Sequence, residues 1–270
     1  MIELLLKKHA NPNILDAEGD TPLTLEIKNE SKLTVINLLL EKNSDPNVYG
    51  QIDPLQLILT KLNFEQKKKE KIITQLILSD FDVNQTKSDF NHLLHICEDK
   101  LISLETFDLI LKKFKTIKID LKKNNPLHVA CSVCPPRREI IYSILQRDCS
   151  SIINEKNSLE LTPLHILSKN KISLKSQQKI FSNPKKNKNF TDENILFLLL
   201  SKRADPNIVD NKKKNPSFYI SSEFENIVTM IRFGCRIQKT DKFNDQFNST
   251  QRYFLSKLEW STEIHQFLPK

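Results

Sequence analysis

The chain has 270 residues, and 41 Lys and Arg against 33 Asp and Glu give it a formal net charge of +8. Hydrophobic residues at 39% and charged residues at 27% place it among globular proteins, and three glycines exclude a collagen-like fibre. The longest apolar run, Ile195–Leu200, is far shorter than the roughly 20 residues of a membrane-spanning helix, and the five cysteines are not spaced as a disulfide framework.

A leucine-rich run followed by a short polar turn recurs along the chain. The runs are Leu4–Leu6, Leu38–Leu40, Leu76–Leu78 and Leu198–Leu200. The turns that follow them carry a shared signature that ends in Asn: Ala10–Asn13, Ser44–Asn47, Phe81–Asn84 and Ala204–Asn207. Apolar residues recur at helical spacing in these runs, as in Val35, Ile36, Leu39 and Leu40, so each run predicts an amphipathic helix.

A second signature, some eight to ten residues after each turn, predicts the start of another helix. Its copies are Thr21–Leu23, Asp53–Leu55, Leu93–His95, Asn125–His128, Thr162–His165 and Asn215–Pro216. Thr, Asp or Asn before Pro suits a helix start, because the polar side chain caps the helix and Pro lacks only an N–H that would be unpaired there. Counted from the prolines, with Leu93 in the third copy, the steps are 32, 39, 33, 37 and 53 residues. The basic repeat is therefore about 33 residues long, with insertions.

These paired signatures resemble the ankyrin repeat family, whose pattern runs D-x-x-G-x-T-P-L-H-x-A, then a second helix, then G-A-D-x-N. The resemblance covers nearly the whole chain. It implies an all-α fold, an ankyrin-repeat α-solenoid with short hairpin turns between helix pairs. Such a pair cannot bury its apolar faces alone, so each repeat is expected to pack against its neighbours.

The spacing predicts an ankyrin repeat array over residues 1–238. It divides into a half repeat at 1–15 and repeats near 16–47, 48–84, 85–120, 121–154, 155–207 and 208–238. Residues 239–270, which include Trp260, are expected to form a divergent C-terminal capping repeat. The half repeat lacks a first helix, so Ile2 and Leu5 are expected to be partly uncovered.

The turn after each leucine run predicts a backbone in the left-handed region. Gly234 occupies this position in one repeat, but the others have His9, Asn43, Asp80 and Arg203. A His or Arg there costs about 1 kcal/mol relative to Gly, so the array is expected to be less stable than one with glycines. Gly19 and Gly50 are placed in the hairpin turns.

Two lysine-rich insertions are predicted. Residues 63–71 carry Lys67–Lys69 and Lys71 between the two helices of a repeat, and Lys169–Phe190 contains seven lysines and no acid. Within the longer insertion, Pro184–Lys188 fits a short nuclear-import pattern, and it also fits a solvated loop or a site attracted to an acidic partner, a nucleic acid or an anionic lipid. Only Phe181 and Phe190 interleave with these lysines, so sequence-specific nucleic-acid recognition is not expected.

Histidine and cysteine do not form a predicted catalytic or metal site. His95, His128 and His165 share the His of the family pattern, where each is expected to bond the backbone of the adjoining hairpin. Cys131 and Cys134 have C-x-x-C spacing, but Cys131 is placed inside a helix after Ala130, at whose position Cys97 stands in another repeat. The expected role is packing. No cofactor, metal site or enzymatic activity is predicted, because glycine-rich phosphate loops and hydrolase, zinc-protease and kinase motifs are missing from the sequence.

The predicted function is therefore binding of another protein, as an ankyrin-repeat scaffold or adaptor. The resemblance implies a concave binding surface of hairpin tips and the exposed side of each first helix. The candidate contact residues are Asp16, Glu18, Asp20, Tyr49, Gln51, Lys87, Asp89, Phe90, Lys122, Lys123, Leu159, Glu160, Lys212, Lys213 and Lys214. Tyr49 and Phe90 are preferred because exposed aromatic side chains concentrate binding energy.

The tips change from acidic to basic along the chain, which predicts a partner that is acidic toward the C-terminal half. The chain is expected to be a monomer in the cytoplasm, or in the nucleus if Pro184–Lys188 acts in import. One alternative is a secreted effector or host-range adaptor of an intracellular bacterium or virus that binds a host protein. Another is a thiol-dependent enzyme that uses Cys131 or Cys134.

Overall fold

The computed structural model describes residues 1–61, 65–85, 89–115, 119–170, 195–220 and 224–237, and the single residues 249, 251, 253 and 257. Over these residues the chain forms helices and turns and no β-strand. Two compact units divide it, unit 1 at Met1–Asp120 and unit 2 at Leu121–Lys270, and each is described by itself.

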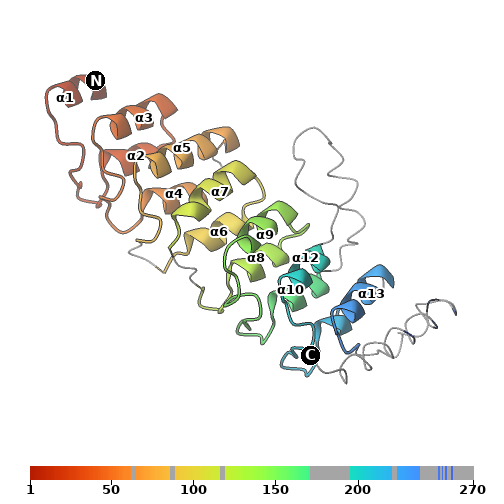
Figure 1. Cartoon of the computed structure of the whole chain (residues 1–270). Coiled ribbons are helices and arrows are strands. Elements are labelled where there is room, and N and C mark those ends of the chain that lie inside the picture. The colour runs from red at the N-terminus through yellow and green to blue at the C-terminus, as the bar shows by residue number, and fades with distance from the viewer. Residues whose placement is uncertain are drawn as a thin grey trace, which may run out of the picture. The chain divides into compact units, whose positions relative to one another are not determined.

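Unit 1 consists of a lone helix followed by helix pairs. The lone helix is α1 (Ile2–Lys7), and the pairs are α2 (Pro22–Lys28) with α3 (Leu33–Glu41), α4 (Pro54–Thr60) with α5 (Gln66–Leu78), and α6 (His92–Glu98) with α7 (Leu104–Lys113). The first helices of the pairs, α2, α4 and α6, pack in one row, and α3, α5 and α7 pack in a second row (Figure 1). Within unit 1, α2 packs on α3 and α4 on α5, so these helices are buried both within their pair and along their row.

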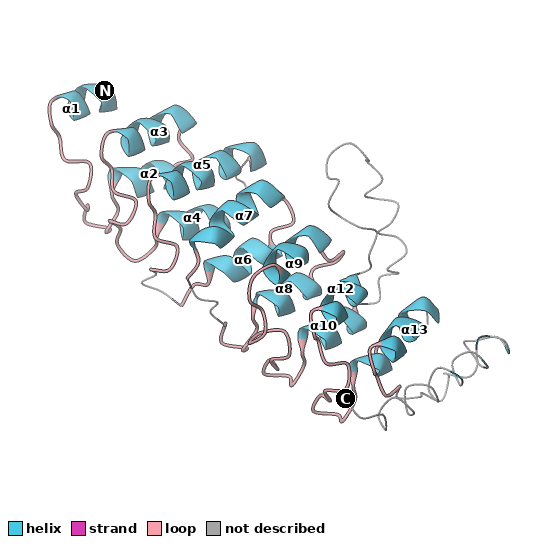
Figure 2. Ribbon diagram, in the orientation of Figure 1, coloured by secondary structure: helices cyan, strands magenta, loops and turns pink. Residues whose placement is uncertain are grey.

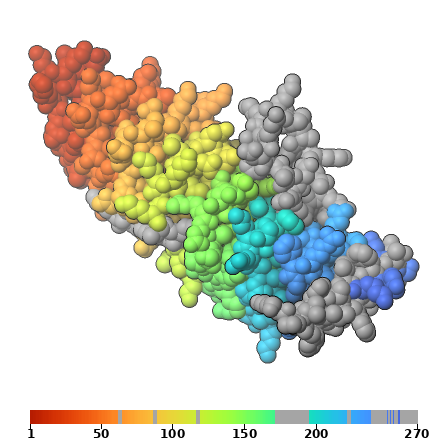
Figure 3. All heavy atoms as spheres, viewed as in Figure 1, coloured from red at the N-terminus to blue at the C-terminus, as the bar shows by residue number. Residues whose placement is uncertain are grey.

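Unit 2 repeats this arrangement. Its helices are α8 (Pro126–Ser132), α9 (Arg138–Leu145), α10 (Pro163–Lys169), α12 (Ile195–Ser201), the short 3-10 helix η1 (Pro216–Phe218) and α13 (Phe224–Arg232). In one row α8 packs on α10 and α10 on η1, and in the other α9 packs on α12 and α12 on α13 (Figure 2). On the face drawn in Figure 3, the atoms of consecutive repeats within each unit lie against one another.

Capped starts of the first helices confirm the predicted helix boundaries. The side chains of Thr21, Asp53, Asn125 and Thr162 each accept a hydrogen bond from the backbone N–H three residues later. Each of these helices has Pro at its first position, where no backbone bond is lost.

The third start was predicted one residue too late. Helix α6 begins at His92, after an Asn91 cap, so His92 and not Leu93 takes the proline position. The steps on either side of it become 38 and 34 residues in place of 39 and 33. The error arose because this repeat has no proline to mark the register of the helix start.

The predicted leucine stripes form the core of each unit. Ile36 and Leu39 in unit 1 and Leu199 in unit 2 are at most 1% exposed. Helix α1 by contrast buries none of its residues, and Leu4 and Leu5 are more than half exposed. The division into repeats and the capping segment at 239–270 stay predictions, and Trp260 lies outside the described residues.

The Asn that ends each turn signature joins consecutive repeats. Its amide nitrogen donates to a backbone carbonyl of the next turn, and its amide oxygen accepts from a backbone N–H two residues further on. In unit 1 these bonds run from Asn13 to Asn43 and Asp45, from Asn47 to Asp80 and Asp82, and from Asn84 to Lys113 and Lys115. In unit 2 they run from Asn154 to Arg203 and Asp205 and from Asn207 to Gly234 and Arg236. Donor and acceptor of one side chain thus fix both the spacing and the register of two repeats.

The predicted left-handed positions are confirmed. The φ angles of His9, Asn43, Asp80 and Arg203 lie between 59° and 71°, and that of Gly234 is 78°. These residues end the second helices in the conformation that only glycine adopts without strain.

Gly50 is required for a different reason. A Cβ atom on Gly50 would lie 2.2 Å from the carbonyl oxygen of Gly19, because the two hairpins approach through their backbones. Any larger residue at position 50 would therefore separate the first two hairpins of unit 1.

The shorter insertion is largely helix. Lys67–Lys69 and Lys71 belong to the first turns of α5, which begins at Gln66. The prediction that they form an insertion between two helices is therefore wrong. Of the longer insertion, Lys169 ends α10 and Asn170 caps it, while residues 171–194, with Pro184–Lys188, lie outside the described part of the chain.

Candidate partner-binding surface

Three of the hairpin tips are held by an Asp or Asn side chain. The Oδ1 atom of Asp16 accepts from the backbone N–H of residues 18 and 20, at 2.9 and 2.8 Å. Asn157 and Asp210 make the same pair of bonds, at 2.9 and 3.1 Å and at 2.8 and 3.0 Å. Asp16 is exposed as predicted, but this bonding gives it a structural role in its own tip.

The residue at the end of four of the described tips has a left-handed backbone. Gly19 occupies this position in unit 1, with a φ of 80°. In unit 2 it is taken by Lys123, Glu160 and Lys213, whose φ angles lie between 57° and 59°. All three side chains are exposed, so the tips of unit 2 place charged groups where the family pattern has glycine.

His128 and His165 join neighbouring repeats of unit 2, as predicted. In each ring Nδ1 accepts from the backbone N–H of the helix cap, at 3.2 Å, so the proton resides on Nε2. From there His128 donates to the carbonyl of Leu161 at 2.9 Å, and His165 donates to that of Lys214 at 3.1 Å. Burial lowers the pKa of His165, against the opposing effects of the Lys214 carbonyl and Asp210.

His95 does not have this role, and the prediction for it is wrong. Its ring is partly exposed and stacks on Phe90 with centroids 4.1 Å apart, and its Nδ1 lies 3.5 Å from Glu98. Burial lowers the pKa of His95, while Glu98 acts to raise it. The buried imidazole of this repeat is His92, which lies 2.9 Å from Asp53 of the preceding helix start. Because α6 starts one residue earlier than predicted, His92 and not His95 is the buried histidine of this repeat.

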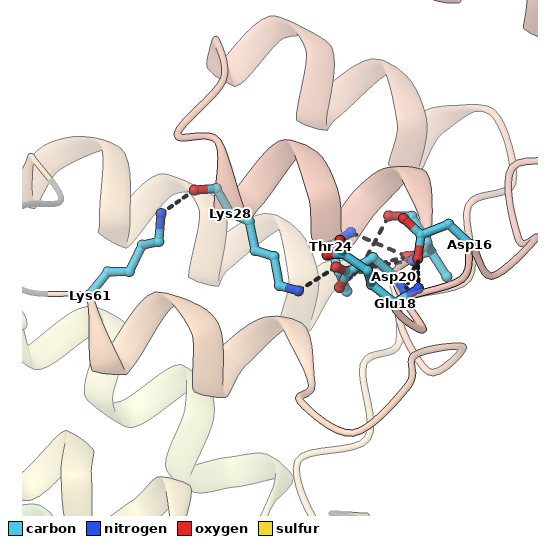
Figure 4. A network of polar contacts seen from close by, with 7 residues as sticks. Asp16, Glu18, Asp20, Thr24, Lys28 and Lys61 are labelled. Atoms are coloured by element: carbon cyan, nitrogen blue, oxygen red, sulfur yellow. Dashed lines mark hydrogen bonds and ion pairs between the residues drawn. The ribbon is translucent and has the colours of Figure 1, made fainter.

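In the first hairpin, Asp20 is a structural residue (Figure 4). Its side chain is buried, accepts from the Thr24 hydroxyl at 3.1 Å and pairs with Lys28. The carbonyl of Lys28 in turn accepts from Lys61 in the next repeat. Asp20 was predicted as a contact residue and is not available as one, whereas Glu18 of the same tip is exposed.

Tyr49 is buried, so its prediction as an exposed contact is also wrong. Its side chain is 2% exposed, and its hydroxyl donates to the carbonyl of Gln85 in the next repeat at 3.1 Å. Burial raises the pKa of Tyr49, with further contributions from Asp53 and Asp82. Tyr49 precedes a hairpin and lies under it, a distinction that a turn signal alone does not make. Gln51, two residues later, is exposed.

The third tip retains an aromatic candidate. Phe90 is half-buried against His92 and His95, and Asp89 beside it is exposed. Lys87 lies outside the described residues. Phe90 therefore offers an edge of its ring and not a free side chain.

The tips of unit 2 are basic and carry exposed leucines. Lys122, Lys123, Lys212 and Lys213 are exposed, and Lys214 is half-buried. Leu159 is 62% exposed, and the neighbouring Glu160 pairs with Lys156 at 2.9 Å. Leu121, which was not predicted, is 90% exposed.

Sequence reasoning also missed an aromatic pair beside these tips. Phe218 and Tyr219 meet edge to face, with ring centroids 5.2 Å apart. The ammonium group of Lys214 lies over the Phe218 ring, and that of Lys169 lies over the Tyr219 ring. The available signal was Pro216-Ser217-Phe218 in place of Pro-Leu-His.

The cysteines do not form a reactive pair. Burial raises the pKa of Cys131 to about 12, so its thiol is protonated at neutral pH, and Cys134 is exposed. The corrected register aligns Cys97 with Cys131 and not with Ala130, and Cys97 is 1% exposed. Cys131 and Cys97 are therefore packing residues.

The described part of the chain has neither a metal-binding cluster nor a membrane-spanning helix. It contains no group of three or more His, Cys, Asp or Glu side chains that could hold a metal ion. It also contains no helix that is long and apolar enough to cross a membrane.

Comparison with solved structures identifies the architecture. The ankyrin repeat domain of Bcl-3, described as a unique member of the IkappaB protein family, is 15% identical, with a TM-score of 0.56 over 85% of this chain and 90% of that one. EF0377, an ankyrin repeat protein, is 16% identical, with a TM-score of 0.56 over 80% of this chain and 98% of that one. The chain has the ankyrin-repeat fold. No protein-family model and no curated protein sequence matches it.

The ankyrin-repeat fold explains why the corrected residues are unavailable. Asp20, Tyr49 and His92 all bond to groups within unit 1: Tyr49 bonds to the next repeat and His92 to the preceding one. What remains for a partner are the outermost side chains of the tips and of the first-row helix ends.

Proposed function

We propose that this ankyrin-repeat chain binds another protein through its hairpin tips and the adjoining ends of the first-row helices. It would act as a monomeric scaffold or adaptor without enzymatic activity, in the cytoplasm or, with the basic Pro184–Lys188 segment, in the nucleus. The proposal rests on two observations: the tips are fixed by Asp16, Asn157 and Asp210, and the side chains at the ends of the unit 2 tips are exposed. A surface held in this way loses little conformational entropy on binding.

The tips of unit 2 favour an acidic partner. Exposed Lys122, Lys123 and Lys212 have no carboxylate within 4.0 Å among the described residues. Their positive charges therefore remain available, and exposed Leu121 and Leu159 add apolar area between them.

Capture of partners from cell extract tests this proposal. The wild-type chain is compared with Lys122→Glu/Lys123→Glu/Lys212→Glu and with the control Lys8→Glu/Lys32→Glu/Lys112→Glu, which reverses the same charge at exposed positions of unit 1. We expect the unit 2 variant to lose partners that the control retains, and retention to fall with salt. Equal retention by the two variants would contradict a role of the basic tips.

A further inference from the structure

Unit 2 contains two lysines whose ammonium groups are positioned over aromatic rings. The Nζ of Lys169, the last residue of α10, lies 4.2 Å from the centre of the Tyr219 ring. The Nζ of Lys214, at the end of the last described tip, lies 4.2 Å from the centre of the Phe218 ring. Both distances are within the range of a cation–π interaction, which restricts the side chains without neutralising their charge.

Asp210, which is bonded to Tyr219, does not neutralise these lysines. Asp210 is buried, its Oδ1 accepts from the tip backbone, and its Oδ2 accepts from the Tyr219 hydroxyl at 2.5 Å. Burial acts to raise the pKa of Asp210, but these hydrogen bonds lower it overall, so the carboxylate is ionised and already bonded. Among the described residues no carboxylate lies within 4.0 Å of the Nζ of Lys169 or Lys214.

This arrangement follows from the departure of the last repeat from the family pattern. His128 and His165 use the third helical position to bond the following hairpin. The same position is Phe218 in the short helix η1, which cannot make such a bond and presents its ring to Lys214. The repeat has exchanged a residue that joins repeats for one that orients a cation.

We infer that Lys169, Lys214, Phe218 and Tyr219 form a binding site for an extended, carboxylate-rich segment of a partner protein. This inference rests on the proposed function and specifies the site within unit 2. The two ammonium groups come from different elements and are point charges, which suits carboxylates spaced along a peptide. A phosphate group would favour an arginine fork or free backbone N–H groups, and Asp210 already occupies those of Lys212 and Lys214. Lysines over the rings also disfavour base stacking.

Fluorescence anisotropy with the full chain tests the site. The probe is a labelled peptide of repeated Glu-Glu-Leu triplets, with a Gln-Gln-Leu peptide as its neutral counterpart. We expect Lys169→Gln/Lys214→Gln to weaken binding of the acidic peptide by about fivefold, the combined effect of two partly exposed ion pairs. The control Lys8→Gln/Lys112→Gln removes the same charge from unit 1 and is expected to change binding by less than about 1.5-fold.

A second variant separates an oriented site from general attraction. Phe218→Leu keeps the net charge and most of the apolar volume but removes the ring under Lys214, so binding is expected to weaken by about twofold. The inference would be overturned if Lys169→Gln/Lys214→Gln kept full affinity for the acidic peptide, or lost no more affinity than the control Lys8→Gln/Lys112→Gln. The proposed function would still be decided separately by the capture experiment. Tighter binding of a labelled oligothymidylate, lost in the same variant, would also overturn it by identifying a nucleic-acid site. Circular dichroism confirms that each variant is folded.

Discussion

Several lysines of unit 1 and two lysines of unit 2 have opposite roles. In unit 1, Lys28 pairs with buried Asp20, Lys69 pairs with Asp99 at 2.5 Å, and Lys61 donates to the carbonyl of Lys28. These bonds connect one repeat to the next or a helix to its hairpin. In unit 2, Lys169 and Lys214 lie over aromatic rings and have no carboxylate partner among the described residues. The three lysines of unit 1 thus stabilise their unit, whereas the two of unit 2 leave positive charges at its surface, a difference that net charge does not reveal.

The largest expected effect concerns Lys69, whose side chain is 9% exposed. Lys69→Ala leaves the Asp99 carboxylate, itself 16% exposed, without its cation, and should lower the free energy of unfolding by about 3 kcal/mol. Urea denaturation measures it, with Lys71→Ala on the exposed face of α5 as the control. A loss below about 1 kcal/mol would mean that water replaces the ammonium and that the lysines of unit 1 are not structural.

The pKa of His165 predicts a pH dependence that belongs to unit 2. Because burial lowers its folded pKa below the ordinary value, the unfolded chain binds the proton more tightly. Stability is therefore fully present above about pH 6.5 and is lost as the pH falls toward the folded pKa.

Denaturation at about pH 7.5 and about pH 5.5 should show this loss in the wild-type chain and a smaller one in His165→Gln, whose amide keeps a donor. For each protein, the change in the free energy of unfolding between the two pH values is compared, since His165→Gln also loses packing at both. The same pH dependence in both would assign the effect to other groups, such as His95.

The contrast also shows what sequence can predict. Thr-Pro and Asp-Pro starts, leucine stripes and Asn-ended turns are local signals, and they located the rows of helices and the left-handed residues. The predicted start of α6 was wrong because its repeat lacks the proline. The predicted exposure of Asp20 and Tyr49 was wrong because a turn pattern does not reveal their bonding partners, Lys28 and Gln85. Exposure of a tip residue depends on contacts that sequence spacing does not contain.

The cost of a left-handed residue can be compared between the two units at Arg203 in unit 2 and Asp80 in unit 1. Both end a second-row helix, with φ angles of 71° and 59°. Arg203→Gly should raise the free energy of unfolding by about 1 kcal/mol, and Asp80→Gly by about half as much, since Asp tolerates this conformation better than Arg. Urea denaturation of each variant provides the test. A gain in Asp80→Gly larger than in Arg203→Gly would contradict an intrinsic backbone cost as the cause.

The smallest expected effect on stability concerns the exposed lysines of unit 2, which contrast with the buried Lys69 of unit 1. Lys122→Gln/Lys212→Gln removes two exposed charges that have no carboxylate within 4.0 Å among the described residues. Because only repulsion is relieved, the free energy of unfolding should rise by less than about 0.5 kcal/mol at low salt, and the difference should vanish at about 0.5 M salt. Denaturation at the two salt concentrations measures it. A clear loss of stability would show that these lysines bind groups within unit 2 after all, and it would leave fewer charges for a partner.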